Sequence, residues 1–118
     1  MRSLDLGYPR TELRRELVAA VLAGAKTATA GLADDEPVPA AGERFVLNGY
    51  DDERCGVVEV VEARVVPARE IDERFARDEG EGFETVDDWR EAHERFFEQP
   101  IEPDTPIVAI RFRLVESA

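Results

Sequence analysis

Lys26 is the residue with the clearest capacity for chemistry, because it is the only lysine among the fifteen basic side chains of the chain. It lies in the segment Gly24-Ala25-Lys26-Thr27-Ala28-Thr29. A buried ammonium can lose its proton and then act as a base, whereas a guanidinium stays charged under ordinary conditions. A codon bias against lysine would also leave one behind, just past a helix end where a cation suits the helix dipole. We take proton transfer at Lys26 as the first hypothesis.

A second group of polar and aromatic residues falls on one expected helix. His93 is the only histidine, and it is either a ligand contact, an acid or base, or a hydrogen-bonded core histidine beside Trp89. Arg90 either recognises a carbonyl or phosphate in a cleft or pairs with a neighbour such as Glu94. Trp89 is expected in the core, with stacking on a nucleobase as the alternative. The single cysteine, Cys55, excludes an internal disulfide framework, and no second His or Cys supports a metal site. We therefore expect neither a metal nor a cofactor.

Length and charge limit the classes of partner. The 118 residues are enough for one domain with its own core, so we expect residues 1–118 to form a single domain. The net charge of -12 repels a long polynucleotide, because nonspecific binding depends on neutralising phosphates. An uncharged nucleoside-like ligand is compatible with that charge. No apolar stretch is long enough for a signal peptide or a membrane span, which favours a cytoplasmic protein without a membrane partner.

Three helices are expected to position these residues, at about 11–23, 68–76 and 86–98. In the first, Leu13, Leu17 and Val21 recur at helical spacing, with Thr11 as the N-cap and Gly24 as the end. The short second helix would bury Ile71 and Phe75, and the third begins at a Thr85–Asp88 capping box. Asp78 to Gly82 should be a loop because of its two glycines.

Strands are expected at 27–32, 43–50, 55–66 and 108–114. The third carries many valines, is interrupted by two glutamates and is stopped by Pro67, which indicates a long strand with a bulge. The fourth has the cleanest alternation of apolar and other residues in the chain. Strands and helices are interspersed, so the predicted class is α+β with a small, barrel-like sheet flanked by helices.

In their order along the chain, several segments resemble the bacterial ASCH-domain family. They are Thr11-Glu12-Leu13, the Gly24–Thr29 segment, the Pro37/Gly42 turn, Glu79-Gly80-Glu81-Gly82, and the Trp89–Phe97 helix with its Trp-Arg-x-x-His pattern. The resemblance implies a PUA-like fold, in which a β-barrel and helices border a cleft. It also implies a link with RNA or modified nucleosides.

Some small ASCH proteins are amidohydrolases that remove the acetyl group from N4-acetylcytidine. The resemblance assigns their lysine and threonine to Lys26 and Thr29, and their glutamate to Glu79 through the spacing Ala-x-x-Glu. Glu81 competes for the glutamate role, although its place between two glycines makes it the less fixed of the two. Those enzymes tend to carry a basic residue where this chain has Gly31, a departure that affects the substrate more than the chemistry.

These groups can hydrolyse an amide bond. Thr29 would be the nucleophile, Lys26 the base that activates it, and Glu79 the group that holds the lysine or carries a proton to the departing amine. Because the odd spacing of Lys26 and Thr29 puts them on opposite faces of a regular strand, we expect irregular backbone at Thr27-Ala28. The substrate is expected to contact four further residues, Thr27, Glu81, Arg90 and His93.

Two other functions fit the same sequence. One is a non-catalytic RNA or nucleotide binding module of PUA type, in which Lys26 contacts a ligand oxygen. The other is a ribonuclease, which the scarcity of clustered basic residues disfavours. The net charge of -12 places the amidohydrolase ahead of both.

Overall fold

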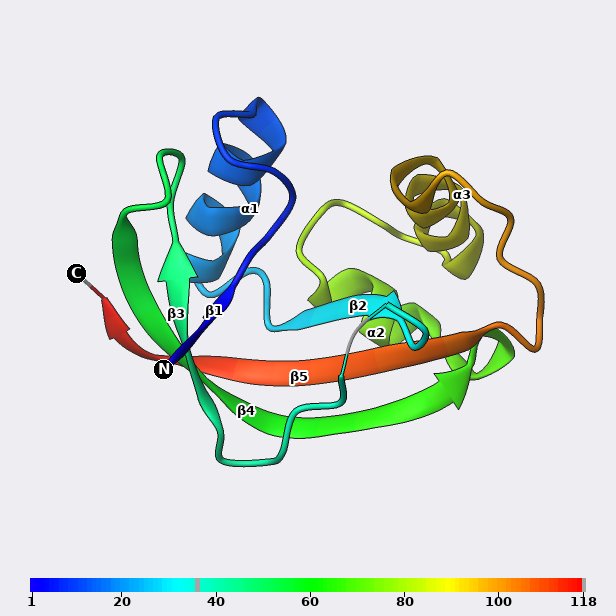
Figure 1. Cartoon of the computed structure of the whole chain (residues 1–118). Helices are drawn as coiled ribbons and strands as arrows, with labels where there is room; N and C mark the ends of the chain where they lie inside the picture. Colours follow the sequence, from blue (N-terminus) through cyan, green and yellow to red (C-terminus); the bar gives the residue numbers. More distant parts are fainter. Residues whose placement is uncertain (36, 118) are drawn as a thin grey trace.

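The computed structural model describes residues 1–35 and 37–117, and its centre is a curved sheet of five strands (Figure 1). The strands are β1 (Arg2–Leu4), β2 (Ala28–Leu32), β3 (Arg44–Asn48), β4 (Arg54–Pro67) and β5 (Pro106–Ser117). Their order in the sheet is β1-β3-β4-β5-β2. Among the described residues the edge strands β1 and β2 do not pair with each other, so the sheet is a half-barrel.

The longest pairing in the sheet is the antiparallel one between β4 and β5, which runs from Pro67 opposite Pro106 to Gly56 opposite Ser117. Its register shifts at two places in β4, between Val57 and Val58 and beyond Val60. Such bulges increase strand twist and bending, and they allow a fourteen-residue strand to curve into a barrel wall. The bulged strand expected from the sequence is confirmed, as are its end at Pro67 and the α+β, PUA-like small barrel.

Strand β1 is not among the strands expected from the sequence. It is only three residues long, and it pairs in parallel with β3, with Arg2 opposite Phe45 and Leu4 opposite Leu47. A three-residue segment has too few positions to show an alternating pattern, so its strand state depends on the partner that the fold supplies.

Helix α1 (Glu12–Leu22) begins as expected, with the Thr11 side chain accepting a hydrogen bond from the Arg14 amide. The buried face differs from the expected one. Leu17 and Val21 are buried, but Leu13 and Leu22 are about 40 % exposed, and the Arg14 side chain is only 1 % exposed. Its guanidinium donates to the carbonyls of residues 6, 7 and 49 and to Asp52, which compensates for the burial of its charge.

The single helix expected at 68–76 is wrong in its bounds. A 3₁₀ turn (Ala68–Glu70) and a separate helix α2 (Glu73–Asp78) replace it. Asp72 separates the two because it has extended backbone and its side chain accepts a hydrogen bond from the Phe75 amide, which starts a new helix. Helix α2 therefore extends to Asp78, and Glu79 caps it instead of lying in a free loop.

Helix α3 (Val86–Phe97) begins at the predicted capping box, in which both hydrogen bonds between Thr85 and Asp88 are present. It ends at Glu98, which has left-handed backbone. Trp89 and His93 form its buried face. The predicted helix of 86–98 is thus confirmed to within one residue.

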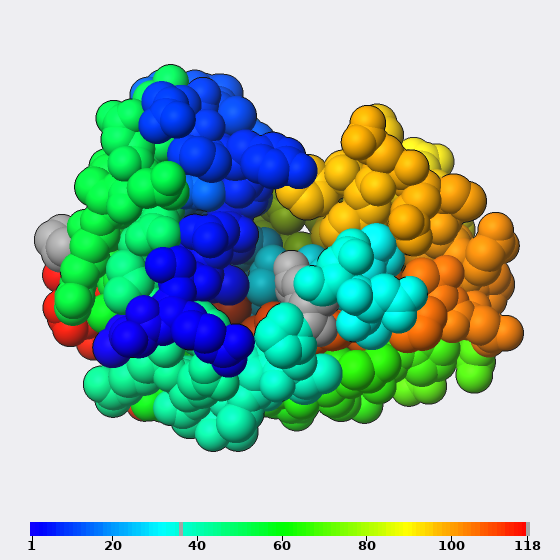
Figure 2. All heavy atoms as spheres, viewed as in Figure 1, coloured from blue at the N-terminus to red at the C-terminus, as the bar shows by residue number. Residues whose placement is uncertain are grey.

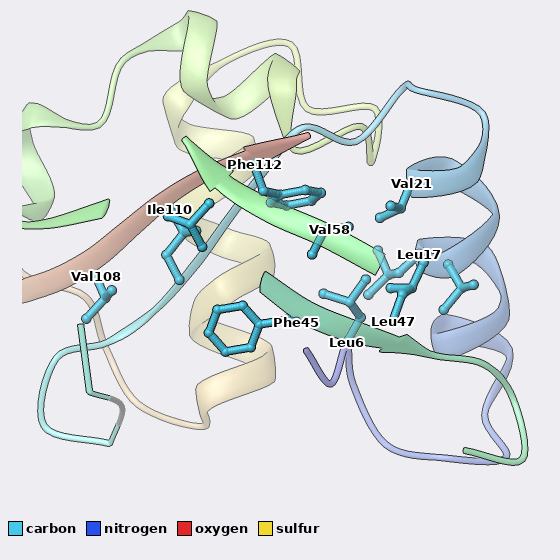
Figure 3. Packing of buried hydrophobic residues seen from close by; sticks show 11 residues of the cluster. Leu6, Leu17, Val21, Phe45, Leu47, Val58, Val108, Ile110 and Phe112 are labelled. Carbon is cyan, nitrogen blue, oxygen red and sulfur yellow. The ribbon is translucent and has the colours of Figure 1, made fainter. Parts of the chain in front are cut away.

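Two buried apolar clusters lie against the half-barrel. One packs α1 against the sheet, with Leu17 and Val21 facing Leu47, Val58 and Phe112 (Figure 3). The other packs α2 and α3 against β2, β4 and β5 around Trp89. Figure 1 shows α1 and α3 apart from each other above the sheet, with β2 and the loop after α2 between them. The site described below lies between the two clusters.

Candidate functional site

A cavity of about 330 Å³ opens between the α1 side of the molecule and α3. Figure 2 shows the surface hollowed at this place, between the blue N-terminal part and the gold part that contains α3. Most of its walls are apolar, from Leu6, Leu13 and Leu17 on one side and Phe83, Phe96 and Phe97 on the other. Its polar lining includes five side chains that carry chemistry: Lys26, Thr29, Glu79, Glu81 and His93.

Lys26 lies at this polar end with its side chain 1 % exposed. Its Nζ lies 2.8 Å from the Ala28 carbonyl and 3.3 Å from the Glu79 carbonyl. It also lies 3.5 Å from Glu79 Oε1 and 3.5 Å from Glu81 Oε2. All four neighbours are hydrogen-bond acceptors, so this arrangement suits the ammonium form, in which every N–H has a partner.

The backbone around Lys26 belongs to neither a helix nor a strand. The chain leaves α1 with the Lys26 amide donating to the Ala20 carbonyl, and β2 does not begin until Ala28. Irregular backbone thus falls at Lys26 and Thr27, one residue earlier than expected. The Thr27 amide donates to the Asp78 carbonyl, and the Thr27 carbonyl accepts from the Phe112 amide. These bonds tie the segment both to the end of α2 and to β5.

Gly80 allows the loop after α2 to approach Lys26 closely. A Cβ atom at this position would lie 2.6 Å from the Ala25 carbonyl oxygen and 2.8 Å from the Lys26 Cα. Its φ of +71° is also in the left-handed region that favours glycine. Both constraints require glycine here, and the close approach brings Glu79 within reach of Lys26.

Glu79 is a buried carboxylate with three donors. Its side chain is 1 % exposed, and its two oxygens face Lys26 Nζ, His93 Nε2 at 3.3 Å and the indole N–H of Trp89. Burial by itself would raise the pKa of this carboxyl, but His93, Lys26 and Trp89 outweigh burial and hold the pKa below its ordinary value. Glu79 is therefore a fixed anion.

The neighbours of His93 indicate which of its ring nitrogens carry protons. Its Nδ1 lies 2.7 Å from the Trp89 carbonyl, which can only accept, so Nδ1 carries a proton. Its Nε2 faces the Glu79 carboxylate, which favours a second proton there. Burial would lower the pKa of His93, but the hydrogen bond and charge of Glu79 outweigh it, and the pKa is raised. The ring also stacks on Trp89 with 4.4 Å between centroids.

Glu81 differs from Glu79 in its surroundings. Its side chain is 22 % exposed, and it lies between Gly80 and Gly82, which both have positive φ. Burial and the neighbouring Glu79 raise the pKa of the Glu81 carboxyl, against the opposing effect of Lys26. Of the two carboxyls beside Lys26, Glu81 is the one that takes up a proton more readily.

Thr29 is the second residue of β2, where it pairs with Ile110 of β5. Its side chain lines the same cavity as Lys26. Among the described residues, its hydroxyl has no hydrogen-bond partner, and the lining places it where a ligand in the cavity can contact it. Lys26 and Thr29 thus line the same cavity.

Two of the expected substrate contacts lie elsewhere. Thr27 does not line the cavity and acts through its backbone, as described above. Arg90 lines a shallow hollow on the other side of α3, and it pairs with Asp87 at 2.9 Å instead of with Glu94. The Glu94 carboxylate accepts from the Ile101 amide. Arg90 and Thr27 are therefore not brought to the cluster that contains Lys26.

Three contributions to the site were not expected from the sequence. Trp89 is a core residue, as predicted, but its indole N–H also fixes Glu79. Tyr8 and Phe96 line the cavity although they are 72 % and 47 % exposed. The only available signal for Phe96 was its place one helical turn after His93, and Tyr8 gave none, because it precedes any periodic segment.

The charge of the cavity limits its ligands. Lys26 and His93 are its only basic lining residues among those described, and both already face carboxylates. Asp5 adds a further carboxylate to the lining. Within residues 1–35 and 37–117, no group of three His, Cys, Asp or Glu side chains is arranged to hold a metal ion. In the same part of the chain, no helix is long and apolar enough to cross a membrane.

Several solved structures share this fold. Protein EF3133 from Enterococcus faecalis V583 superposes with a TM-score of 0.86 and 26 % identity, over 99 % of this chain and 77 % of that one. An ASCH domain from Lactobacillus crispatus JV V101 gives a TM-score of 0.73 and 25 % identity, over 85 % and 70 %. The hypothetical protein PH0355 shares the fold alone, with a TM-score of 0.65 and 18 % identity over 87 % and 94 %.

No functionally curated protein matches this sequence at a significant level. The family model of the ASCH domain matches residues 6–116, a range that includes Lys26, Thr29, Glu79, Glu81 and His93 of the cavity lining. The chain therefore belongs to the ASCH domain family.

Proposed function

We propose that this protein is an amidohydrolase that acts on an N-acylated pyrimidine nucleoside such as N4-acetylcytidine. The observation that carries the proposal is a lysine that is 1 % exposed, lies between two carboxylates and opens on a cavity that also presents a threonine hydroxyl. Buried ionisable groups with opposite charge partners in a cleft are typical of catalytic sites. The family resemblance supports the same three residues, Lys26, Thr29 and Glu79.

The reaction begins with a proton transfer that makes Lys26 a base. Glu81 accepts a proton from the Lys26 ammonium, since its raised pKa makes it the better acceptor of the two carboxyls. Neutral Lys26 then takes the proton of the Thr29 hydroxyl as the oxygen attacks the carbonyl carbon of the amide. The C–N bond breaks, the protonated Glu81 gives its proton to the departing amine, and water hydrolyses the acyl-threonine ester.

Glu79 has a different part in this scheme. Three donors fix its carboxylate and its pKa is lowered, so it holds Lys26 in place and balances its charge instead of carrying a proton. Trp89 and His93 fix Glu79 in turn. Supporting residues that fix their neighbours in this way keep a catalytic group such as Lys26 in its productive position.

The charge distribution favours a nucleoside over RNA. Most arginines of the described residues form ion pairs with carboxylates on the surface, for example Arg2 with Glu43 and Arg113 with Glu59. Within the described part of the chain, the cavity lining offers no unpaired cation to a phosphate. Both an RNA-binding module and a ribonuclease need such cations, to bind the backbone or to stabilise a phosphorane-like transition state.

A panel of N4-acylated cytidines tests the proposal. The purified protein is incubated with N4-acetyl-, N4-propionyl- and N4-benzoylcytidine, and release of cytidine is followed by liquid chromatography. Hydrolysis by the unchanged protein, together with its loss in a Thr29→Ala variant of equal thermal stability, is the expected result. The absence of cytidine from every reaction, or equal release by Thr29→Ala, would reject the proposed activity.

A further inference from the structure

Two exposed aromatic side chains face each other at the mouth of the cavity. Tyr8 is 72 % exposed and Phe96 is 47 % exposed, and both line the cavity from opposite sides. Their ring centroids are 6.1 Å apart, and their planes differ by 32°. Large aromatic side chains on the surface of a cleft are informative, because their apolar area would otherwise be buried.

Side chains at the start of α1 hold the backbone that carries Tyr8. Arg14 donates to the carbonyls of Leu6 at 2.8 Å and Gly7 at 2.9 Å, and the Thr11 hydroxyl donates to the carbonyl of Tyr8 at 2.7 Å. Three successive carbonyls are thus fixed by the start of α1. The ring of Tyr8 is therefore presented to the cavity from a rigid support while the ring itself stays exposed.

An aromatic path connects the mouth with the buried carboxylate. The ring of Phe96 lies 5.8 Å from that of Phe97, which lies 5.7 Å from that of His93. His93 in turn faces Glu79. A planar apolar group therefore finds ring surfaces along the α3 wall from the mouth to the polar end.

We propose that Tyr8 and Phe96 form a clamp for the pyrimidine ring of the ligand, which leaves its exocyclic N-acyl group to reach Lys26 and Thr29. The clamp rests on the proposed function for the identity of its occupant. A ring stacked between two others needs its neighbours about 7 Å apart, twice the contact distance of carbon atoms. The observed distance of 6.1 Å between the ring centroids is about 1 Å shorter than this. Side-chain motion of the two exposed residues can separate the rings by the missing distance.

The charge of the surroundings fits this occupant. Asp5, Glu79 and Glu81 line the same cavity, so a neutral ring is accepted more readily than an anionic group. Stacking also tolerates different bases, because every base has a π-face. The clamp thus supplies binding energy for the planar part of the ligand, and the polar end selects the amide.

Four variants test the clamp through the dissociation constant of cytidine, measured by titration calorimetry. Tyr8→Ala and Phe96→Ala should each weaken binding by about 5- to 150-fold, the range of base–aromatic stacking. Tyr8→Phe should bind like the unchanged protein, because it keeps the ring. Val65→Ala is the matched control, since Val65 is also exposed but lies on β4 outside the cavity.

The outcomes separate the clamp from the proposed function. If N4-acetylcytidine is hydrolysed while Tyr8→Ala and Phe96→Ala keep the original affinity, the clamp is rejected and the activity stands. If no acyl group is released but cytidine binding depends on both rings, the clamp stands and the activity is rejected. Failure of the unchanged protein to bind cytidine would overturn the clamp.

Discussion

Lys26 Nζ lies 3.5 Å from Glu79 Oε1, and each of the two side chains is only 1 % exposed. Burial of an ion pair is costly, and replacing one by apolar residues is often neutral or stabilising for a fold. The pair is therefore weak evidence for a contribution to the stability of the fold and better evidence for a functional site. It is completed by Glu81 on the cavity side and by His93 and Trp89 behind Glu79.

Substitution of Gly80 should reduce stability and turnover more than substitution of Gly82. Both have positive φ, so an alanine at either costs about 1–2 kcal/mol of backbone strain. A Cβ at Gly80 would also clash with Ala25 and Lys26, whereas one at Gly82 meets nothing within 4 Å. Gly80→Ala should therefore lower both the free energy of unfolding and turnover more than Gly82→Ala does. Denaturant unfolding and steady-state kinetics measure this, and equal effects of the two variants would show that the close approach is unimportant.

Substitution of Glu79 and substitution of Glu81 should have different effects on stability and turnover. Glu79→Gln leaves Lys26 and His93 without their buried counter-ion, so it should cost about 3–5 kcal/mol of stability as well as turnover. Glu81→Gln should leave stability nearly unchanged and reduce turnover by about two to four orders of magnitude, the range for loss of a general acid or base. A Glu81→Gln variant with normal turnover would return the proton-carrying role to Glu79.

The pH dependence of activity follows from the same assignment. Burial raises the pKa of Glu81, and the residue must be ionised to accept the lysine proton. The kcat/KM of the unchanged protein should therefore rise with pH on the acidic side, with an apparent pKa above the ordinary value of about 4.3. Glu81→Gln should remove this limb from its residual activity, and persistence of the limb would exclude Glu81 as its source.

His93 should stabilise the fold mainly at low pH. Its pKa is raised in the folded protein, so the stabilisation is complete below its unfolded value of about 6.5 and is lost as pH rises through the folded value. Glu79 stays ionised in this range because its own pKa is lowered. The difference in free energy of unfolding between the unchanged protein and His93→Gln should thus be largest near about pH 6 and smaller near about pH 9. A constant or growing difference would contradict a charged His93.

Single-stranded RNA should not bind at micromolar concentrations. The net charge is -12, and at about 0.15 M ionic strength the Debye length is roughly 8 Å, so distant repulsion is screened but close approach still needs local cations. Fluorescence anisotropy with a labelled RNA oligomer measures this. Tight binding that weakens steeply with added salt would instead favour an RNA-binding module.

The sequence predicted best what depends on local pattern. The strand at 108–114, the capping box at Thr85 and the N-cap at Thr11 each involve residues close in the chain, and each is confirmed. The expectation that the strand is half-buried fails over its first half, because Ile107 and Ala109 pack in one apolar cluster while Val108 and Ile110 pack in the other. The division of 68–76 into two helices was missed because it depends on Asp72, whose side chain competes with helical bonding by capping a new helix.

Features that depend on distant partners could not be predicted in the same way. Arg14 reads as a surface residue of an amphipathic helix, and its burial is stable only because carbonyls of residues 6, 7 and 49 accept from it. Lys26 could be singled out by its uniqueness, but its carboxylate partners lie more than fifty residues away in the chain, and only the family resemblance pointed to Glu79 and Glu81. Only the fold brings these groups together.

The activity of Lys26→Arg on N4-acetylcytidine tests the central claim most directly. A guanidinium keeps the charge but cannot give up its proton, so it can balance Glu79 yet cannot act as a base. Circular dichroism and thermal unfolding first establish that the variant is folded, and release of cytidine is then compared with that of the unchanged protein. Hydrolysis by the unchanged protein with a loss of at least about 100-fold in folded Lys26→Arg is the predicted result. Near-normal hydrolysis by Lys26→Arg would contradict the assignment of Lys26 as the base.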